Sequence, residues 1–293
     1  MHYDDGAFYR PLFENDMLQL QVARGCSHNR CKFCDMYHEP FRVSPIEEVE
    51  QDLDEVVASV PCVRRVFLTG GNALCLPYER LVGIMEAVRG RYPNASIGCF
   101  ARVTDVARKT DEQLARLVEL GLSDVSVGTE SGLDEALEAM DKGFCVEESL
   151  RQCLRMEAAG LSYDLFYLLG MAGAGRVEDS ALATARLYSQ LAPNRIMVHT
   201  MTSFAGTRLA EMVENGDFTM AGELETVREL RRFVEEYEPR GRVYLLGNHY
   251  GNVAHACAWL PEQCDELLGY LDMVLQDADE EELRARRSRM LSI

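Results

Sequence analysis

The chain has 293 residues, 47% of them hydrophobic, and a formal net charge of −18. The apolar share excludes a disordered or fibrous protein, and the surplus of carboxylates disfavours nucleic acid as a partner because phosphates carry the same charge. No apolar run reaches the ~18 residues of a membrane span, and segment 1–10 lacks the pattern of a signal peptide. We therefore expect a cytoplasmic protein without a membrane partner, in which thiols stay reduced.

Strand-like and helix-like segments alternate through most of the chain. The strand-like segments are short and apolar and often end at glycine, whereas the helix-like segments have apolar residues every three or four positions. The first helix is expected to have Ser44 as its N-cap and Pro45 as its first helical residue. The expected strands are 17–25, 64–71, 95–103, 122–131, 161–170 and 194–204, and the expected helices are 44–59, 78–92, 110–121, 134–143, 146–160, 177–192 and 207–216.

These segments form six strand–helix units, a pattern typical of a parallel sheet with right-handed crossovers. Six units are too few to close an eight-stranded barrel. We therefore predict an α/β fold, a partial (β/α)6 TIM-type barrel over residues 1–220. Residues 221–293 are expected to form a mostly helical C-terminal extension that packs on the barrel, interrupted by the segment 242–252.

Three cysteines follow the first expected strand within nine residues. Cys26, Cys31 and Cys34 have the spacing C-x4-C-x2-C, and loops after strands form the active face of a barrel. A structural zinc site takes four protein ligands, and His28 or His38 could be the fourth. An iron–sulfur cubane normally takes four cysteines. Three cysteines would leave one iron open to a further ligand.

This loop resembles the cluster-binding loop of the radical S-adenosylmethionine (SAM) superfamily. The usual spacing of that family is C-x3-C-x2-C, so this chain has one extra residue between Cys26 and Cys31. The resemblance implies a [4Fe-4S] cluster held by the three cysteines, with SAM on the open iron. It also implies that Phe33, before the third cysteine, lies near the adenine.

Later strand ends resemble further motifs of the family. The segment "TGGNA" resembles the element that accepts the SAM amino group, which implies binding by Gly70, Gly71 and Asn72. A plain strand-to-helix turn is the alternative. The segment "VSVGTESG" resembles the fourth-strand motif of the branch that includes anaerobic coproporphyrinogen oxidases, tRNA methylthiotransferases and the elongator catalytic subunit. The resemblance implies that Glu130 would bind the ribose hydroxyls and that Ser131 is a further cofactor-binding residue. A structural cap for the next helix is the alternative for Glu130.

Two more strand ends are weaker matches. Arg102, after the third strand, could pair with the SAM carboxylate or with substrate, or form a salt bridge at the barrel mouth. The segment "YLLGMAGAG" resembles the fifth-strand stretch that lines the adenine, and it carries over only Leu169 and backbone. "TSFAGTRL" resembles the end of the sixth strand in the same branch.

The resemblance implies an oxygen-sensitive enzyme, an oxidoreductase or transferase. One electron from a low-potential donor such as flavodoxin or ferredoxin would cleave SAM to a 5′-deoxyadenosyl radical, and that radical would take a hydrogen atom from substrate. A small organic molecule or a peptide is the favoured substrate. Tyr167, His199 and His249 are further catalytic candidates with Arg102, although strand alternation leaves open whether Tyr167 and His199 face the interior.

Two other functions stay open at this point. One is a protein that binds or delivers haem or another tetrapyrrole on the same fold, and the other is a zinc-stabilised scaffold without redox chemistry. The charged segment 277–290 is either a solvated terminal helix or a helix that docks on a partner.

Overall fold

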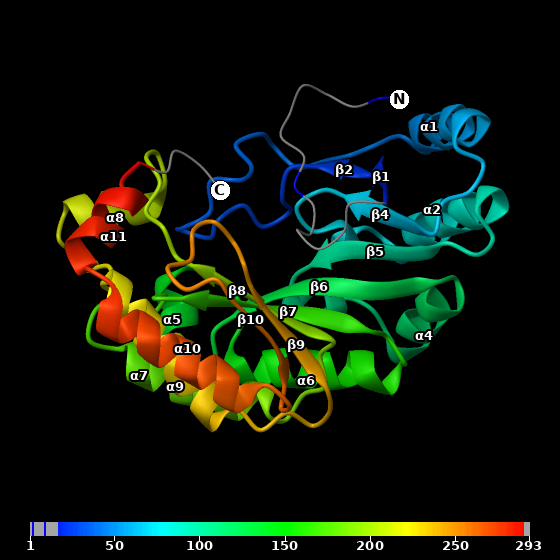
Figure 1. Cartoon of the computed structure of the whole chain (residues 1–293). Coiled ribbons are helices and arrows are strands. Elements are labelled where there is room, and N and C mark those ends of the chain that lie inside the picture. The colour runs from blue at the N-terminus through cyan, green and yellow to red at the C-terminus, as the bar shows by residue number, and fades with distance from the viewer. Residues whose placement is uncertain (1, 3–8, 10–16, 290–293) are drawn as a thin grey trace. The chain divides into compact units, whose positions relative to one another are not determined.

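The computed structural model describes residues 2, 9 and 17–289, so most of the segment tested for a signal peptide lies outside the described residues. The chain divides into two compact units. Figure 1 labels helices and strands from which they are built. Unit 1 consists of Met1–Asn29, Met36–Gly128 and Leu154–Tyr163, and unit 2 consists of Arg30–Asp35, Thr129–Cys153 and Asp164–Ile293.

Unit 1 contains a parallel sheet with helices between its strands. The strands pair in the order β1-β4-β5-β6, and the last two residues of β6 belong to unit 2. A short antiparallel pair, β2 with β3, flanks the cysteine loop. The strands are β1 (Leu18–Gln21), β2 (Ala23–Arg24), β3 (Arg42–Val43), β4 (Arg65–Thr69), β5 (Ser96–Ala101) and β6 (Leu122–Glu130); the helices are α1 (Ile46–Ser59), η1 (Ala73–Cys75), α2 (Tyr78–Arg91), α3 (Val103–Ala107) and α4 (Asp111–Glu119).

Local sequence explains where the helices of unit 1 begin. Helix α4 starts at a capping box, in which the Thr110 hydroxyl accepts from the Gln113 amide and the Gln113 side chain accepts from Thr110. Helix α1 begins one residue later than expected. Its N-cap is Pro45, which offers no side-chain hydrogen bond, so the expectation that Ser44 caps this helix is wrong.

Unit 2 contains four further strands in the order β7-β8-β9-β10. β8 pairs in parallel with β7 and β9, and β10 returns antiparallel to β9. The strands are β7 (Tyr163–Leu169), β8 (Arg195–Thr200), β9 (Val243–Gly247) and β10 (Ala256–Leu260); the helices are α5 (Asp134–Ala139), α6 (Val146–Ala158, which ends in unit 1), α7 (Val177–Tyr188), α8 (Arg208–Glu214), α9 (Glu223–Glu236), α10 (Cys264–Asp277) and α11 (Glu280–Arg287).

The prediction of an α/β protein with parallel strands and six strand–helix units is confirmed. The C-terminal region is less helical than expected, because β9 and β10 extend the pairing that begins at β8. Among the described residues, neither unit closes its strands into a barrel. The domain division at residue 220 stays a prediction.

No helix in the described part of the chain combines the length and apolarity needed to cross a membrane.

Candidate functional site

The Cys26 end of the cysteine loop lies against the end of β4 in unit 1. The Gly71 amide donates to the Gly25 carbonyl over 2.9 Å. A Cβ added at Gly71 would lie 2.7 Å from the Cβ of Cys26 and 2.9 Å from its Cα, closer than atoms in proteins approach. Glycine at this position therefore allows the strand end to contact the loop backbone directly.

Asn72 attaches the same loop through its side chain. The Asn72 Oδ1 accepts from the Ser27 amide over 2.9 Å, and its Nδ2 donates to the Ser27 hydroxyl over 2.8 Å and to Asp105 Oδ2 over 2.9 Å. Asn72 is fully buried, and these three bonds engage both ends of its amide. The structure thus places Asn72 as a support for the cysteine loop, whereas the sequence indicated a cofactor ligand.

Arg102 follows β5 in the same unit and is 9% exposed. Its amide donates to Asp105 Oδ2 over 2.8 Å, and its guanidinium donates to the Thr104 hydroxyl over 2.9 Å. Asp105 therefore joins the end of β5 to the β4 end through Asn72. The sequence did not single out Asp105, although it lies in the same short segment as Arg102, three residues further on.

The Cys31–Cys34 end of the loop belongs to unit 2 and is held by backbone bonds. The Lys32 amide donates to the Met140 carbonyl over 3.1 Å, and the Lys32 carbonyl accepts from the Leu209 amide over 2.8 Å. The Cys34 amide donates to the Cys31 carbonyl over 3.2 Å, which closes a tight turn between these two cysteines. Residues after α5 and at the start of α8 thus position this end.

Glu130 stands at the end of β6 with a left-handed φ of 67°. Its carboxylate forms an ion pair with the Lys142 ammonium at 3.0 Å, and both side chains are largely buried. The Lys142 Nζ also lies 5.6 Å from the ring centroids of Phe33 and Phe144. The structure therefore brings Glu130 and Phe33 together around Lys142, which the sequence did not single out.

Ser131 is fully buried next to Glu130. Its hydroxyl accepts from the Leu133 amide over 3.1 Å, and the following Gly132 amide donates to the Thr184 hydroxyl over 2.9 Å. These bonds assign Ser131 to the turn between β6 and α5. The expected role of Ser131 in cofactor binding stays a prediction.

Tyr167 and Leu169 lie on the face of β7 that packs against helices. The Tyr167 hydroxyl donates to Glu229 Oε1 of α9 over 3.0 Å, and its ring contacts Phe233 at 4.9 Å. Tyr167 has no exposed surface. This placement contradicts the expected catalytic role of Tyr167, and Leu169 shares its face because side chains alternate along a strand.

Leu168 occupies the opposite face of β7, where an adenine-lining residue was expected. It is in register with His199 of β8 and belongs to a buried cluster with Met140 and Met171, against which Phe33 packs. The adenine-lining role expected of Leu169 stays a prediction, and the structure places Leu168 rather than Leu169 in register with His199. Strand alternation allowed both faces, and only the packing of α9 against β7 distinguishes them.

His199 and His249 lie together at the ends of β8 and β9. Their rings stack with centroids 4.4 Å apart, and His199 also contacts Phe166 edge-on at 5.4 Å. Burial, with a smaller contribution from His249, lowers the pKa of His199 to about 3. Burial also lowers the pKa of His249, with His255 and Arg287 as further causes. Both imidazoles are therefore neutral at pH 7 and can exchange hydrogen bonds with a polar substrate.

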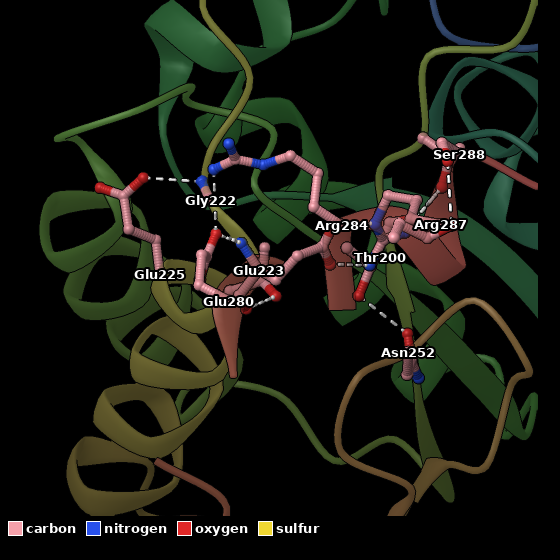
Figure 2. A network of polar contacts seen from close by, with 12 residues as sticks. Thr200, Gly222, Glu223, Glu225, Asn252, Glu280, Arg284, Arg287 and Ser288 are labelled. Carbon is pink, nitrogen blue, oxygen red and sulfur yellow. Dashed lines mark hydrogen bonds and ion pairs between the residues drawn. The ribbon is translucent and has the colours of Figure 1, made fainter. Parts of the chain in front are cut away.

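A polar network joins the end of β8 to the C-terminal helices (Figure 2). The Arg287 guanidinium binds both carboxylate oxygens of Glu223 and donates to the Thr202 hydroxyl over 2.9 Å. Glu280 accepts from the amides of Glu223 and Leu224 at the start of α9. Helix α11 is thus docked on its own unit by side chains at both of its ends.

The three cysteines have a donor set that suits an iron–sulfur cluster. All three thiols are half-buried, and thiolates are the usual ligands of such clusters. A side chain at position 71 would overlap Cys26, so the glycine lets Cys26 keep its place against the end of β4. Cys26 belongs to unit 1 and Cys31 and Cys34 to unit 2. In the described ranges, no group of three or more His, Cys, Asp or Glu side chains is placed to hold a metal, so the three-cysteine site stays a prediction.

A model of the radical SAM superfamily matches residues 20–188. This stretch is more than half of the chain, and it includes the three cysteines, the glycine pair after β4 and Glu130. The chain belongs to the radical SAM superfamily. The protein is accordingly assigned to this class of enzymes, as its cysteine loop indicated.

Three comparisons illustrate how distant its relatives are. An uncharacterized protein of Methanocaldococcus jannaschii is 20% identical over 247 residues, which are 80% of this chain and 76% of the relative. Coproporphyrinogen III oxidase of Escherichia coli is 16% identical with a TM-score of 0.58, covering 76% of this chain and 53% of the oxidase. Methylornithine synthase is 14% identical with a TM-score of 0.56, covering 94% of this chain and 82% of the synthase.

The likeness to solved structures at these identities concerns the fold alone. The chain spans only 35% of the length of another solved structure that it matches, a cobalamin-dependent SAM radical enzyme, OxsB. Neither a haem carrier nor a zinc scaffold is supported by these comparisons. The substrate must therefore be argued from the site itself.

Proposed function

We propose that this protein reductively cleaves SAM at a [4Fe-4S] cluster held by Cys26, Cys31 and Cys34, and that it acts on a small organic molecule or a peptide. The observation that carries the proposal is the family match over residues 20–188, which contains the complete three-cysteine loop. The tight attachment of Cys26 and Ser27 to the end of β4 supports it further.

When bound, the cluster and SAM would supply a 5′-deoxyadenosyl radical that can take a hydrogen atom from substrate. The contribution of the protein is positioning and exclusion of water. Gly70 and Gly71 let backbone approach a ligand, and Phe33 offers an apolar ring. Glu130, oriented by Lys142, offers carboxylate oxygens that can accept from two hydroxyls.

The substrate would contact the His199–His249 pair. The His249 Nδ1 already accepts from the Gly251 amide over 3.2 Å, so His249 can donate through its other ring nitrogen. A neutral His199 can donate one hydrogen bond and accept one. Such a pair suits an uncharged polar group. Arg102 offers a cation for a carboxylate of SAM or of substrate. A low-potential electron donor of the flavodoxin or ferredoxin type and a cytoplasmic location complete the proposal.

The test is anaerobic reconstitution with iron and sulfide, reduction in the presence of SAM, and quantification of 5′-deoxyadenosine. Wild type is compared with Cys31→Ala, and Cys62→Ala is the matched control because Cys62 is an exposed thiol outside the loop. We expect 5′-deoxyadenosine from wild type and Cys62→Ala, and none from Cys31→Ala.

Metal analysis of the same samples distinguishes the other outcomes. A cluster without SAM cleavage, together with stoichiometric haem binding by the apo protein, would support a delivery protein. About one zinc per chain without inorganic sulfide would support a scaffold. Either result would overturn the proposed function.

A further inference from the structure

We propose that Asp105 is a positioning residue for the cluster-binding loop: through Asn72 it sets the backbone at Ser27 and so the placement of Cys26. The role in cluster binding rests on the proposed function, whereas the role in loop placement does not. All four residues belong to unit 1.

The contacts form a continuous chain of hydrogen bonds. Asp105 Oδ2 accepts from the Asn72 Nδ2 over 2.9 Å and from the Arg102 amide over 2.8 Å. The Asn72 Oδ1 accepts from the Ser27 amide, and its Nδ2, which bonds Asp105, also donates to the Ser27 hydroxyl. Asp105 thus connects the ends of β4 and β5 with the residue directly after Cys26.

The chemistry of the groups determines the orientation of the Asn72 amide. A carboxylate only accepts hydrogen bonds, so Asp105 requires the NH2 end of Asn72 to face it. The oxygen end is then directed at the Ser27 amide, which can only donate. With the amide reversed, two acceptors would meet at Asp105 and two donors at Ser27, in a site where Asn72 and Asp105 have no exposed surface.

The loop has little freedom to relax if this orientation is lost. Gly71 is in direct contact with Cys26, and the Gly71 amide is bonded to the Gly25 carbonyl. A displacement of Ser27 would therefore move Cys26 against the end of β4. Lys109 is buried and donates to the Leu74 carbonyl over 2.9 Å. The Asp105 carboxylate interacts with it electrostatically and opposes the lowering of the Lys109 pKa by burial.

The experiment measures the rate at which the reconstituted protein loses iron to a ferrous-iron chelator under anaerobic conditions. We expect Asp105→Ala to raise this rate about tenfold, because the Asn72 amide loses the bond that orients it. Asp105→Asn keeps an acceptor at the same place and should restore a rate within about twofold of wild type. Ser27→Ala, which removes the hydroxyl partner of Asn72 at an exposed loop position, should raise the rate roughly threefold.

Thr110→Ala is the matched control for overall stability. Thr110 caps α4 in the same unit, and its removal lowers stability without touching the loop. We expect no more than a twofold change in iron release for this variant. An acceleration equal to that of Asp105→Ala would show a general loss of stability and overturn the proposal.

A measurement without metal separates this inference from the proposed function. In the apo proteins, the rate of Cys26 alkylation by iodoacetamide is followed by peptide mass spectrometry, with Cys62 as the internal reference. Asp105→Ala and Ser27→Ala should change the Cys26 rate at least threefold relative to Cys62, and Asp105→Asn should not. If no variant assembles a cluster but these alkylation rates differ as stated, only the proposed function fails. Unchanged alkylation and iron release in Asp105→Ala and Ser27→Ala would refute the role of Asp105.

Discussion

Glu229 of α9 is a buried carboxylate that contacts two residues at the end of β7 in unit 2. It accepts from the Tyr167 hydroxyl of β7 and, over 2.7 Å, from the Gly170 amide in the turn after β7. Burial raises the pKa of Glu229 to about 7, although its hydrogen bonds act in the opposite direction. The carboxylate thus fixes the end of β7 and also makes stability depend on pH.

The sign of that dependence follows from the raised pKa. A folded pKa of about 7 against an ordinary 4.5 means that the folded state binds more protons in this window, so stability is lost as pH rises through it. Glu229→Gln cannot titrate. We expect the unfolding free energy of wild type relative to Glu229→Gln to fall by about 2.5 kcal/mol between pH 5 and pH 8. Urea unfolding at both pH values measures this difference, and a constant difference would contradict the prediction.

Gly71 and Gly83 form a matched pair for testing the strand end. A Cβ at Gly71 would overlap Cys26, whereas a Cβ at Gly83 in α2 meets nothing within 4 Å. We expect Gly71→Ala to reduce iron and sulfide content after reconstitution at least fivefold, and Gly83→Ala to bind normally and gain roughly 0.5–1 kcal/mol of stability. Equal cluster content in both variants would show that the contact is dispensable.

At the scale of elements, α11 shows how a charged helix can be held without an apolar face. It has no buried residues among its eight, yet Glu280 caps α9 and Arg287 binds Glu223 and Thr202. Neither expectation for the segment 277–290, a solvated helix or a helix for a partner, included this docking within the chain. The ion pair joins residues 64 positions apart, which no local pattern reveals.

Arg287→Ala should release this helix. The side chain of Glu223 is 7% exposed and would lose its cation, so we expect a loss of about 2 kcal/mol in unfolding free energy and faster proteolysis within 277–289. Arg284→Ala is the control, since Arg284 is 69% exposed and pairs with Glu280 on the same helix; it should cost less than about 0.5 kcal/mol. The same proteolysis rate in both variants would refute the role of Arg287.

At the scale of the whole molecule, the net charge of −18 restricts the partners. Non-specific nucleic-acid binders rely on cations that neutralise phosphates. We expect no change in the fluorescence anisotropy of labelled tRNA at 150 mM salt with up to about 100 μM protein. Saturable binding in the low micromolar range would contradict this expectation and make a tRNA substrate the better proposal.

The sequence by itself determined the family and the order of the elements. Cysteine spacing, the glycine pair before Asn72 and the alternation of strands and helices are local patterns, because each depends on residues that are neighbours in the chain. They led to the three cysteines and to Glu130 without a structure. They also led to a parallel α/β fold, which the observed pairings confirm.

Only the tertiary structure decided what each strand face contacts. Alternation places Leu168 and Leu169 on opposite faces of β7. Only the packing of α9 against Tyr167 shows that the face with Tyr167 and Leu169 is the one covered by helices. The same holds for Asp105, whose partners in β4 and the cysteine loop are remote in sequence. The pairing of β9 with β8 could not be read from the sequence either, since hydrogen bonds between strands leave no local pattern.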